Sequence, residues 1–194
     1  MRRIVLASTS PYRRELLSRL HLPFDCLPPS VDEVAPAGES PRHTARRLAQ
    51  AKAEAVAAAA PDAIVIGCDQ VADLDGRALN KPGGHEAALA QLLELQGRAA
   101  VFHSALALAT DGGARIDVDC VDTEVRFRKL SRAQVEAALR IDRPYDCAGA
   151  AKIESYGIAL VESVRCDDPT ALIGLPLIRL VAMLGALGVT VPPG

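Results

Sequence analysis

Short apolar runs alternate along the chain with longer stretches of helical spacing. Apolar runs bounded by turn residues predict strands at 4–7, 24–27 and 63–68, followed by two long strands at about 99–110 and 114–128. Asp75-Gly76 and Asp111-Gly112-Gly113 have the composition of tight turns between strands. Alternation in the last long strand is imperfect, so the pattern leaves its register open.

Helix starts are marked by a cap residue followed by proline, first at Ser10-Pro11 and again at Ser40-Pro41. The second helix is expected to run to about Ala60, with apolar residues at helical spacing. Further helices are predicted at 84–96, at 131–140, and from near 168 past Pro176 to about 187 with a bend or restart at Gly174 and Pro176. This order of strands and helices predicts one α/β domain over residues 1–194.

The first seventeen residues combine a strand, a hydroxyl-rich turn and a helix start. Ser8, Thr9 and Ser10 form the turn, and Arg13 and Arg14 follow in the first turn of the helix. Free backbone N–H groups and the helix dipole favour a bound anion there, and arginine matches phosphate geometry. A phosphate cradle and a well-capped surface helix are equally compatible with this stretch.

Lys52 falls in the centre of the apolar stripe of the second helix, four residues after Leu48 and four before Val56. A lysine that faces a core must extend its ammonium to solvent or meet an anion. Either explanation is open, and the second would aim Lys52 at a phosphate.

Asp69 and Gln70 close the apolar run at 63–68, which has the pattern of a central strand covered on both faces. Ligands in α/β sheets bind at the carboxyl ends of strands, and an acid there needs a partner. Asp69 is therefore the best catalytic candidate, with a turn aspartate as the alternative. Lys81 adds another cation on the loop that leaves the hairpin at Asp75-Gly76.

Two adjacent acids, Asp32 and Glu33, lie in a proline-rich loop. They are either a solvated pair or ligands for Mg²⁺ or Mn²⁺, which prefer hard oxygen donors.

Charge and cysteine content narrow the class of partner. The net charge of −2 argues against a general binder of nucleic acid or of membrane surfaces, and no apolar run approaches a membrane span. The five cysteines are odd in number and lack metal-site spacing, which suggests a reducing cytoplasm. We expect a cytoplasmic protein with a small-molecule partner and with neither a nucleic-acid nor a membrane partner.

Seven segments in order resemble the Maf family of nucleoside triphosphate pyrophosphatases over nearly the full length. They are Ala7-Ser8-Thr9-Ser10-Pro11-Tyr12-Arg13-Arg14, Val31-Asp32-Glu33, Ala51-Lys52-Ala53, Gly67-Cys68-Asp69-Gln70, Asn80-Lys81-Pro82, Cys147-Ala148-Gly149, and Asp168-Pro169-Thr170 with Gly174-Leu175-Pro176-Leu177. Each motif alone is weak evidence for the family, but the occurrence of all seven in this order and at these separations is specific for it.

The resemblance implies a mixed β-sheet flanked by helices with a deep nucleotide-binding cleft, a homodimer, and hydrolysis between the α and β phosphorus that depends on a divalent metal cation (Mg²⁺ or Mn²⁺). By similarity, Asp69 is the proton acceptor that activates water. The residues that would hold the triphosphate are Ser8, Arg13, Lys52 and Lys81, and Glu33 would help to carry the metal.

Three positions that vary with the nucleobase within the family are Tyr12, Gln70 and Glu154 here. This combination is similar to the branch that acts on 7-methyl-GTP, although a tryptophan is frequent there at the position of Tyr12. An aromatic face stabilises the positive ring of 7-methylguanine, and a carboxylate can accept its N1–H and N2–H. The alternatives are the same chemistry on dTTP, UTP or another modified nucleotide, or a nucleotide-binding regulator of cell division and septum formation.

Overall fold

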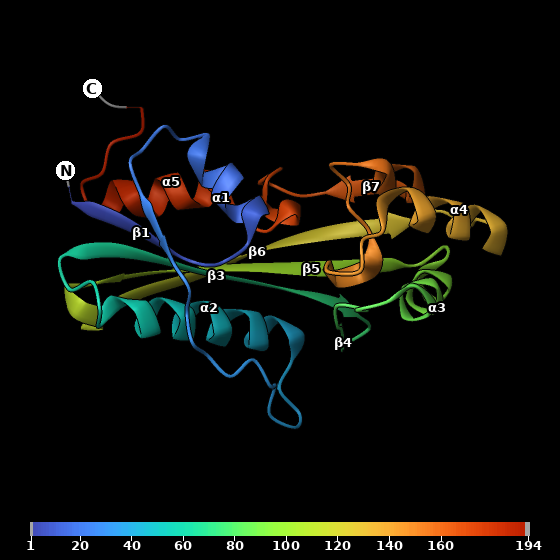
Figure 1. Ribbon diagram of the computed structural model, residues 1–194, viewed down its shortest axis with the longest axis horizontal. Coiled ribbons are helices and arrows are strands. Elements are labelled where there is room, and N and C mark those ends of the chain that lie inside the picture. Colours follow the sequence, from blue (N-terminus) through green and yellow to red (C-terminus); the bar gives the residue numbers. More distant parts are fainter. Residues whose placement is uncertain (1, 193–194) are drawn as a thin grey trace.

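A seven-stranded mixed sheet forms the centre of the computed structural model, which describes residues 2–192 (Figure 1). Its main path runs β2-β1-β3-β5-β6-β7, and β4 pairs with β3. The strands are β1 Arg3–Ala7, β2 Asp25–Leu27, β3 Ala63–Leu74, β4 Arg77–Leu79, β5 Ala99–Thr110, β6 Arg115–Phe127 and β7 Val161–Arg165. The pairs β1–β2 and β1–β3 are parallel and the remaining pairs are antiparallel, which confirms the expected mixed α/β sheet.

Helices cover both faces of this sheet. In Figure 1, α2 (Pro41–Ala57) lies along one face, while α1 (Pro11–Ser18) and α5 (Leu177–Ala186) lie on the other. The helices α3 (His85–Leu95) and α4 (Arg132–Asp142) gather at the far end of the long strands. Four single-turn 3₁₀ segments occur at Asp111–Gly113, Ala148–Ala150, Tyr156–Leu160 and Ala171–Ile173.

Gly67 fixes how closely α2 approaches β3. A Cβ atom at this position would lie 2.1 Å from the carbonyl oxygen of Ala49 and 2.6 Å from the amide nitrogen of Ala53. No larger residue fits without moving backbone, so the glycine allows the helix to rest directly on the strand. This contact places Lys52, which lies between Ala49 and Ala53 in the same turn of α2, beside Asp69 of β3.

The predicted helix starts are confirmed by their caps. The Ser10 hydroxyl accepts a hydrogen bond from the Arg13 amide, and the Ser40 hydroxyl accepts one from the His43 amide. The apolar stripe predicted for α2 is buried, from Ala45 to Val56. Because each cap satisfies an orphan N–H group, these helices begin where the sequence pattern placed them.

One predicted element needs correction. The strand expected to end at Asp69 continues to Leu74, because Val71 and Ala72 keep pairing with β5. The expected restart of the last helix at Gly174 and Pro176 is confirmed, with a 3₁₀ turn at Ala171–Ile173 before it and α5 after it. Gly174 has a φ of 120°, which a helix does not accommodate.

Asp69 lies beside a cleft because a neighbouring strand stops, and not because its own strand ends. The last pair between β1 and β3 joins Ala7 to Gly67, so Asp69 lies two residues beyond the end of β1. The turn that leads into α1 occupies the space that β1 vacates. Among residues 2–192, no helix has both the length and the apolar character required to cross a bilayer.

Candidate active site

One cleft with two connected compartments lies beside the end of β1. The polar compartment contains Ser8, Glu33 and Lys52, and the apolar compartment is walled by side chains that include Phe102 and Phe127. Both compartments are lined by Ser10, Tyr12, Arg13, Lys81 and Asp146, so they adjoin each other across these side chains. Eight of the nine site residues expected from the sequence line this cleft, and the ninth, Asp69, contacts Lys52.

Lys52 joins two carboxylates that are distant in sequence. Its Nζ lies 2.7 Å from Oδ1 of Asp69 and 2.6 Å from Oε1 of Glu33. Lys52 and Asp69 are each only 7% exposed, whereas the Glu33 side chain is 58% exposed. The hydrogen bond from Lys52 lowers the pKa of Glu33 below its ordinary value, against a smaller opposing effect of burial. Of the two interpretations of Lys52 that the sequence left open, the structure therefore supports an ammonium that meets an anion. The anions it meets here are carboxylates of the protein itself.

The turn between β1 and α1 is held by its own hydroxyl groups. The Ser8 hydroxyl accepts a hydrogen bond of 3.1 Å from the Ser10 amide, and the Ser10 hydroxyl caps α1 at the Arg13 amide. Pro11 has no N–H group and the Arg13 and Arg14 amides are bonded to Ser10, so the first turn of α1 offers the Tyr12 N–H group and the positive end of its dipole beside the polar compartment.

Arg13 is anchored to the segment before α5. Its Nε donates to the carbonyl oxygen of Gly174 at 3.0 Å, which leaves the two terminal nitrogens of the guanidinium for a ligand in the cleft. Arg14, by contrast, is exposed and lines neither compartment.

Gln70 forms hydrogen bonds with the same segment before α5. Its Nε2 lies 2.9 Å from the Ser104 hydroxyl and 3.0 Å from each of the carbonyl oxygens of Ala171 and Leu172. Ser104 also donates to Ala171, at 2.7 Å. The amide nitrogen of Gln70 is thus committed to the 3₁₀ turn that leads to Gly174, while the residue still lines the apolar compartment.

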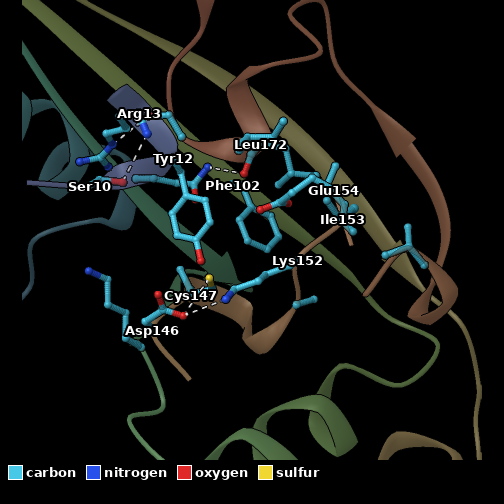
Figure 2. A pocket seen from close by; sticks show the side chains of 18 of the residues that line it. Ser10, Tyr12, Arg13, Phe102, Asp146, Cys147, Lys152, Ile153, Glu154 and Leu172 are labelled. Atoms are coloured by element: carbon cyan, nitrogen blue, oxygen red, sulfur yellow. Dashed lines mark hydrogen bonds and ion pairs between the residues drawn. The ribbon is translucent and has the colours of Figure 1, made fainter. Parts of the chain in front are cut away.

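The apolar compartment has a charged rim. Figure 2 shows the Tyr12 hydroxyl turned toward Lys152, with Glu154 on the side of Phe102 and Leu172. The Nζ of Lys152 lies 5.4 Å from the centroid of the Tyr12 ring and 3.3 Å from Oδ1 of Asp146.

The contact between Lys152 and the Tyr12 hydroxyl is the main cause that raises the pKa of Lys152, and Asp146 raises it further. Burial acts to raise the pKa of Asp146, but hydrogen bonds, chiefly from Lys152, hold the net value below the ordinary one. Both groups are therefore charged near neutral pH, and Asp146 balances Lys152.

Lys152 and Asp146 are cleft residues that the sequence pattern did not single out. Asp146 precedes Cys147-Ala148-Gly149, and Lys152 lies two residues before Glu154, so their only signal was proximity to a motif. Asp32, which was left open as a metal ligand, instead accepts a hydrogen bond from the Val34 amide at 3.0 Å and stabilises the loop.

Hard oxygen donors for a divalent cation are present in the polar compartment. Glu33 uses Oε1 on Lys52 and keeps its second oxygen, and the Asp69 carboxylate lies on the same ammonium. This donor set suits Mg²⁺ or Mn²⁺ better than a soft metal.

Comparisons with known proteins agree with this arrangement. The chain is 53% identical over 190 residues to the 7-methyl-GTP pyrophosphatase of Albidiferax ferrireducens, covering 98% of this chain and 96% of that protein. It is 56% identical over 186 residues to the protein of the same name from Bordetella pertussis, covering 96% and 92%. Among solved structures, the Staphylococcus aureus Ham1 protein matches 64% of this chain and 71% of its own, at 20% identity and a TM-score of 0.46. The family model for Maf-like proteins matches residues 3–187, and the chain belongs to the Maf-like protein family.

Proposed function

We propose that this protein is a nucleoside triphosphate pyrophosphatase that hydrolyses 7-methyl-GTP to the monophosphate and pyrophosphate. Relatives at 53–56% identity over nearly the whole chain carry the name 7-methyl-GTP pyrophosphatase. The observation that carries the proposal is that the two compartments adjoin. A cation-lined polar space for a triphosphate lies next to an apolar space with a carboxylate, Glu154, for a base, and the two share five lining residues.

Cations and backbone dipoles would hold the triphosphate. Arg13 and Lys81 line both compartments, and the start of α1 adds the Tyr12 N–H group at the same place. The Arg13 side chain is held in place because its Nε donates to the Gly174 carbonyl. Such a fixed set of positive groups stabilises the charge that develops on the phosphates during cleavage.

Asp69 would take the proton from the attacking water. The oxygen of that water bonds to the α phosphorus. The bond between the α phosphorus and the oxygen that bridges it to the β phosphorus breaks, and pyrophosphate leaves with the bonding electron pair. Lys52 can change its partner during the reaction. Its ammonium forms ion pairs with Asp69 and Glu33 and can turn to a phosphate oxygen when the triphosphate binds. That exchange would free the Asp69 carboxylate to accept a proton from the attacking water.

Glu33, with Asp69 beside it, would hold the divalent cation, Mg²⁺ or Mn²⁺. When bound, that cation supplies charge neutralisation on the phosphate oxygens. The residues themselves contribute the oxygen donors and keep the cation next to the polar compartment.

Base selection would depend on charge. Asp146 balances Lys152, which leaves the Glu154 carboxylate as the charge available to the positive 7-methylguanine ring. Glu154 can accept N1–H and N2–H, Lys152 can donate to the O6 carbonyl, and the Tyr12 ring offers a face for stacking. Gln70 enters this proposal as a support of the compartment wall, since its amide nitrogen is already bonded.

The test is pyrophosphate release from 7-methyl-GTP, GTP, dTTP and UTP at matched concentrations, each with Mg²⁺ and with Mn²⁺. We expect the highest kcat/KM for 7-methyl-GTP. Preference for dTTP or UTP would keep the reaction and overturn the base assignment. Tight binding of triphosphates without any release would support the regulator alternative instead. A homodimer and a cytoplasmic location, both expected from the sequence, stay predictions.

A further inference from the structure

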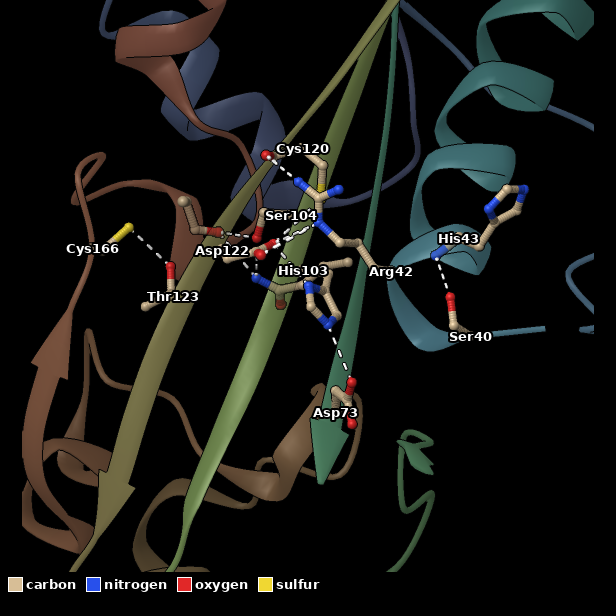
Figure 3. Close-up of polar contacts among 12 residues, drawn as sticks. Ser40, Arg42, His43, Asp73, His103, Ser104, Cys120, Asp122, Thr123 and Cys166 are labelled. Carbon is tan, nitrogen blue, oxygen red and sulfur yellow. Dashed lines mark hydrogen bonds and ion pairs between the residues drawn. The ribbon is translucent and has the colours of Figure 1, made fainter. Parts of the chain in front are cut away.

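A second group of chemically reactive side chains lies outside the cleft, on the sheet face that α2 covers. His103 of β5 pairs directly across from Asp122 of β6, and Cys120 lies two residues before Asp122 on the same face of that strand (Figure 3). One ligand atom from each of the three residues lies within 4.8 Å of the other two. His103 and Cys120 are buried, whereas 44% of the Asp122 side chain is exposed.

The spacing of these atoms is close to that of a tetrahedral metal site. The Nδ1 of His103 lies 2.8 Å from Oδ1 of Asp122, and the Sγ of Cys120 lies 3.7 Å from the same oxygen. Around a tetrahedral zinc ion, nitrogen, oxygen and sulfur ligands are about 3.2–3.6 Å apart, given the usual bond lengths. Small side-chain rotations would therefore bring all three atoms to one ion.

The far side of the imidazole has the partner that metal-binding histidines usually have. The Nε2 of His103 lies 3.3 Å from Oδ2 of Asp73, whose other oxygen accepts a hydrogen bond from the Gly76 amide at 2.6 Å. A carboxylate on one ring nitrogen orients the ring and makes the other nitrogen a better ligand. Asp73 thus directs Nδ1 toward Cys120 and Asp122.

Solvent access to these three side chains and the charge around them are also compatible with a bound metal ion. A surface hollow lined in part by Arg42, Cys120 and Asp122 leads to the group. The Nε of Arg42 lies 3.4 Å from Oδ1 and 3.3 Å from Oδ2 of Asp122, and its Nη2 donates to the Cys120 carbonyl at 3.5 Å. Arg42 therefore balances Asp122 when no ion is present and can keep Oδ2 when Oδ1 binds one.

We propose that His103, Cys120 and Asp122 form a binding site for a transition-metal ion of the Zn²⁺ type, separate from the Mg²⁺ or Mn²⁺ of the cleft. Imidazole and thiolate donors select zinc or cobalt over magnesium and manganese. On binding, the Cys120 thiol gives its proton to solvent and the sulfur bonds to the ion. Three protein ligands leave a fourth position for water.

Co²⁺ is the probe that tests this site, because a thiolate–cobalt bond gives a charge-transfer absorption that oxygen ligands in the cleft cannot give. We expect the full-length protein to bind one Co²⁺ per chain with this absorption and with the visible bands of tetrahedral cobalt. Zn²⁺ should displace it. Cys120→Ser should lose the absorption, and Cys26→Ser, a matched change on β2, should keep it.

Asp73→Asn separates ligation from a structural role. It should retain the charge-transfer absorption while weakening Co²⁺ binding about 10- to 100-fold, the usual effect of removing such a partner. Circular dichroism checks that each variant is folded, and Cys120→Ser changes only one side-chain atom. Absence of the absorption in the unmodified protein, or equal absorption in Cys120→Ser, would overturn the proposal.

Discussion

The ammonium of Lys52 lies 2.7 Å from Oδ1 of Asp69, and both side chains are almost wholly buried. Neither group would be stable there alone, because an isolated buried charge is costly. The pair depends on Gly67, which lets α2 approach β3 closely enough for the contact. Helix packing, the buried ion pair and the candidate base are therefore one structural unit.

Asp69→Asn should lower kcat for pyrophosphate release by about two to four orders of magnitude, the usual reach of acid–base catalysis. The amide keeps the size of the side chain but cannot take a proton from water. KM should change little, since the proposed phosphate-binding cations remain. Steady-state kinetics with 7-methyl-GTP measure both quantities.

The matched control for this change is Asp62→Asn, an exposed aspartate at the turn before β3. It should leave kcat unchanged. Normal turnover in Asp69→Asn would show that another residue is the base.

The contact between Glu33 and Lys52 should make stability depend on pH in the acid range. The fold lowers the pKa of Glu33 from its ordinary value of 4.5, so the stabilisation is complete above pH 4.5 and is lost as the pH falls through the lowered value. Because the Glu33 side chain is 58% exposed, we expect only about 0.2–1 kcal/mol.

Urea unfolding between pH 6 and pH 3 measures this contribution. Glu33→Gln should reduce the fall in the free energy of unfolding over that range, while Glu162→Gln, an exposed change on β7, should not. An identical pH dependence in Glu33→Gln and the unmodified protein would contradict the assignment.

Local sequence signals were sufficient for the helix starts at Ser10 and Ser40 and for the strands β1, β2, β5 and β6, but they did not predict β7. Ser10-Pro11 and Ser40-Pro41 act through hydrogen bonds within three residues, so their caps can be predicted without knowledge of the rest of the chain. Asp69 was found for a partly wrong reason. Its strand does not end there, and its position beside the cleft, behind Lys52, comes from the end of β1, about sixty residues earlier in the chain.

Features that depend on register or on distant segments were not predictable. The pairing of His103 with Asp122 requires the register of β5 and β6, which imperfect alternation left open. The contacts of Gln70 with Ala171 and Leu172 join residues about a hundred positions apart. The family resemblance suggested Gln70 as a specificity residue. Only the structure revealed its bonds to the segment before α5.

Gln70→Leu should raise KM for all nucleotides by a similar factor. It leaves the Leu172 carbonyl without its side-chain donor, while the Ala171 carbonyl keeps the Ser104 hydroxyl, at a cost of about 1–3 kcal/mol in the free energy of unfolding. The displaced turn carries Gly174, which anchors Arg13. KM values for 7-methyl-GTP and UTP, with Gln50→Leu on the surface of α2 as the control, test this. A change confined to one base would instead support direct recognition by Gln70.

Two substitutions of Glu154 separate the contribution of its charge to base recognition from that of its hydrogen-bond acceptors. Glu154→Gln keeps an acceptor oxygen and loses the charge, so it should reduce the preference for 7-methyl-GTP over GTP. Glu154→Ala removes both, so it should also raise KM for GTP well above any change for UTP.

The size of the first effect follows from exposure. Glu154 is on the open side of the apolar compartment, where a charge contact is worth about 0.2–1 kcal/mol, or up to roughly fivefold in relative kcat/KM. Glu162→Gln, an exposed carboxylate outside the cleft, controls for a general change in charge. Equal losses for 7-methyl-GTP, GTP and UTP in Glu154→Ala would remove Glu154 from base recognition and leave Tyr12 and Lys152 as the residues that distinguish the base.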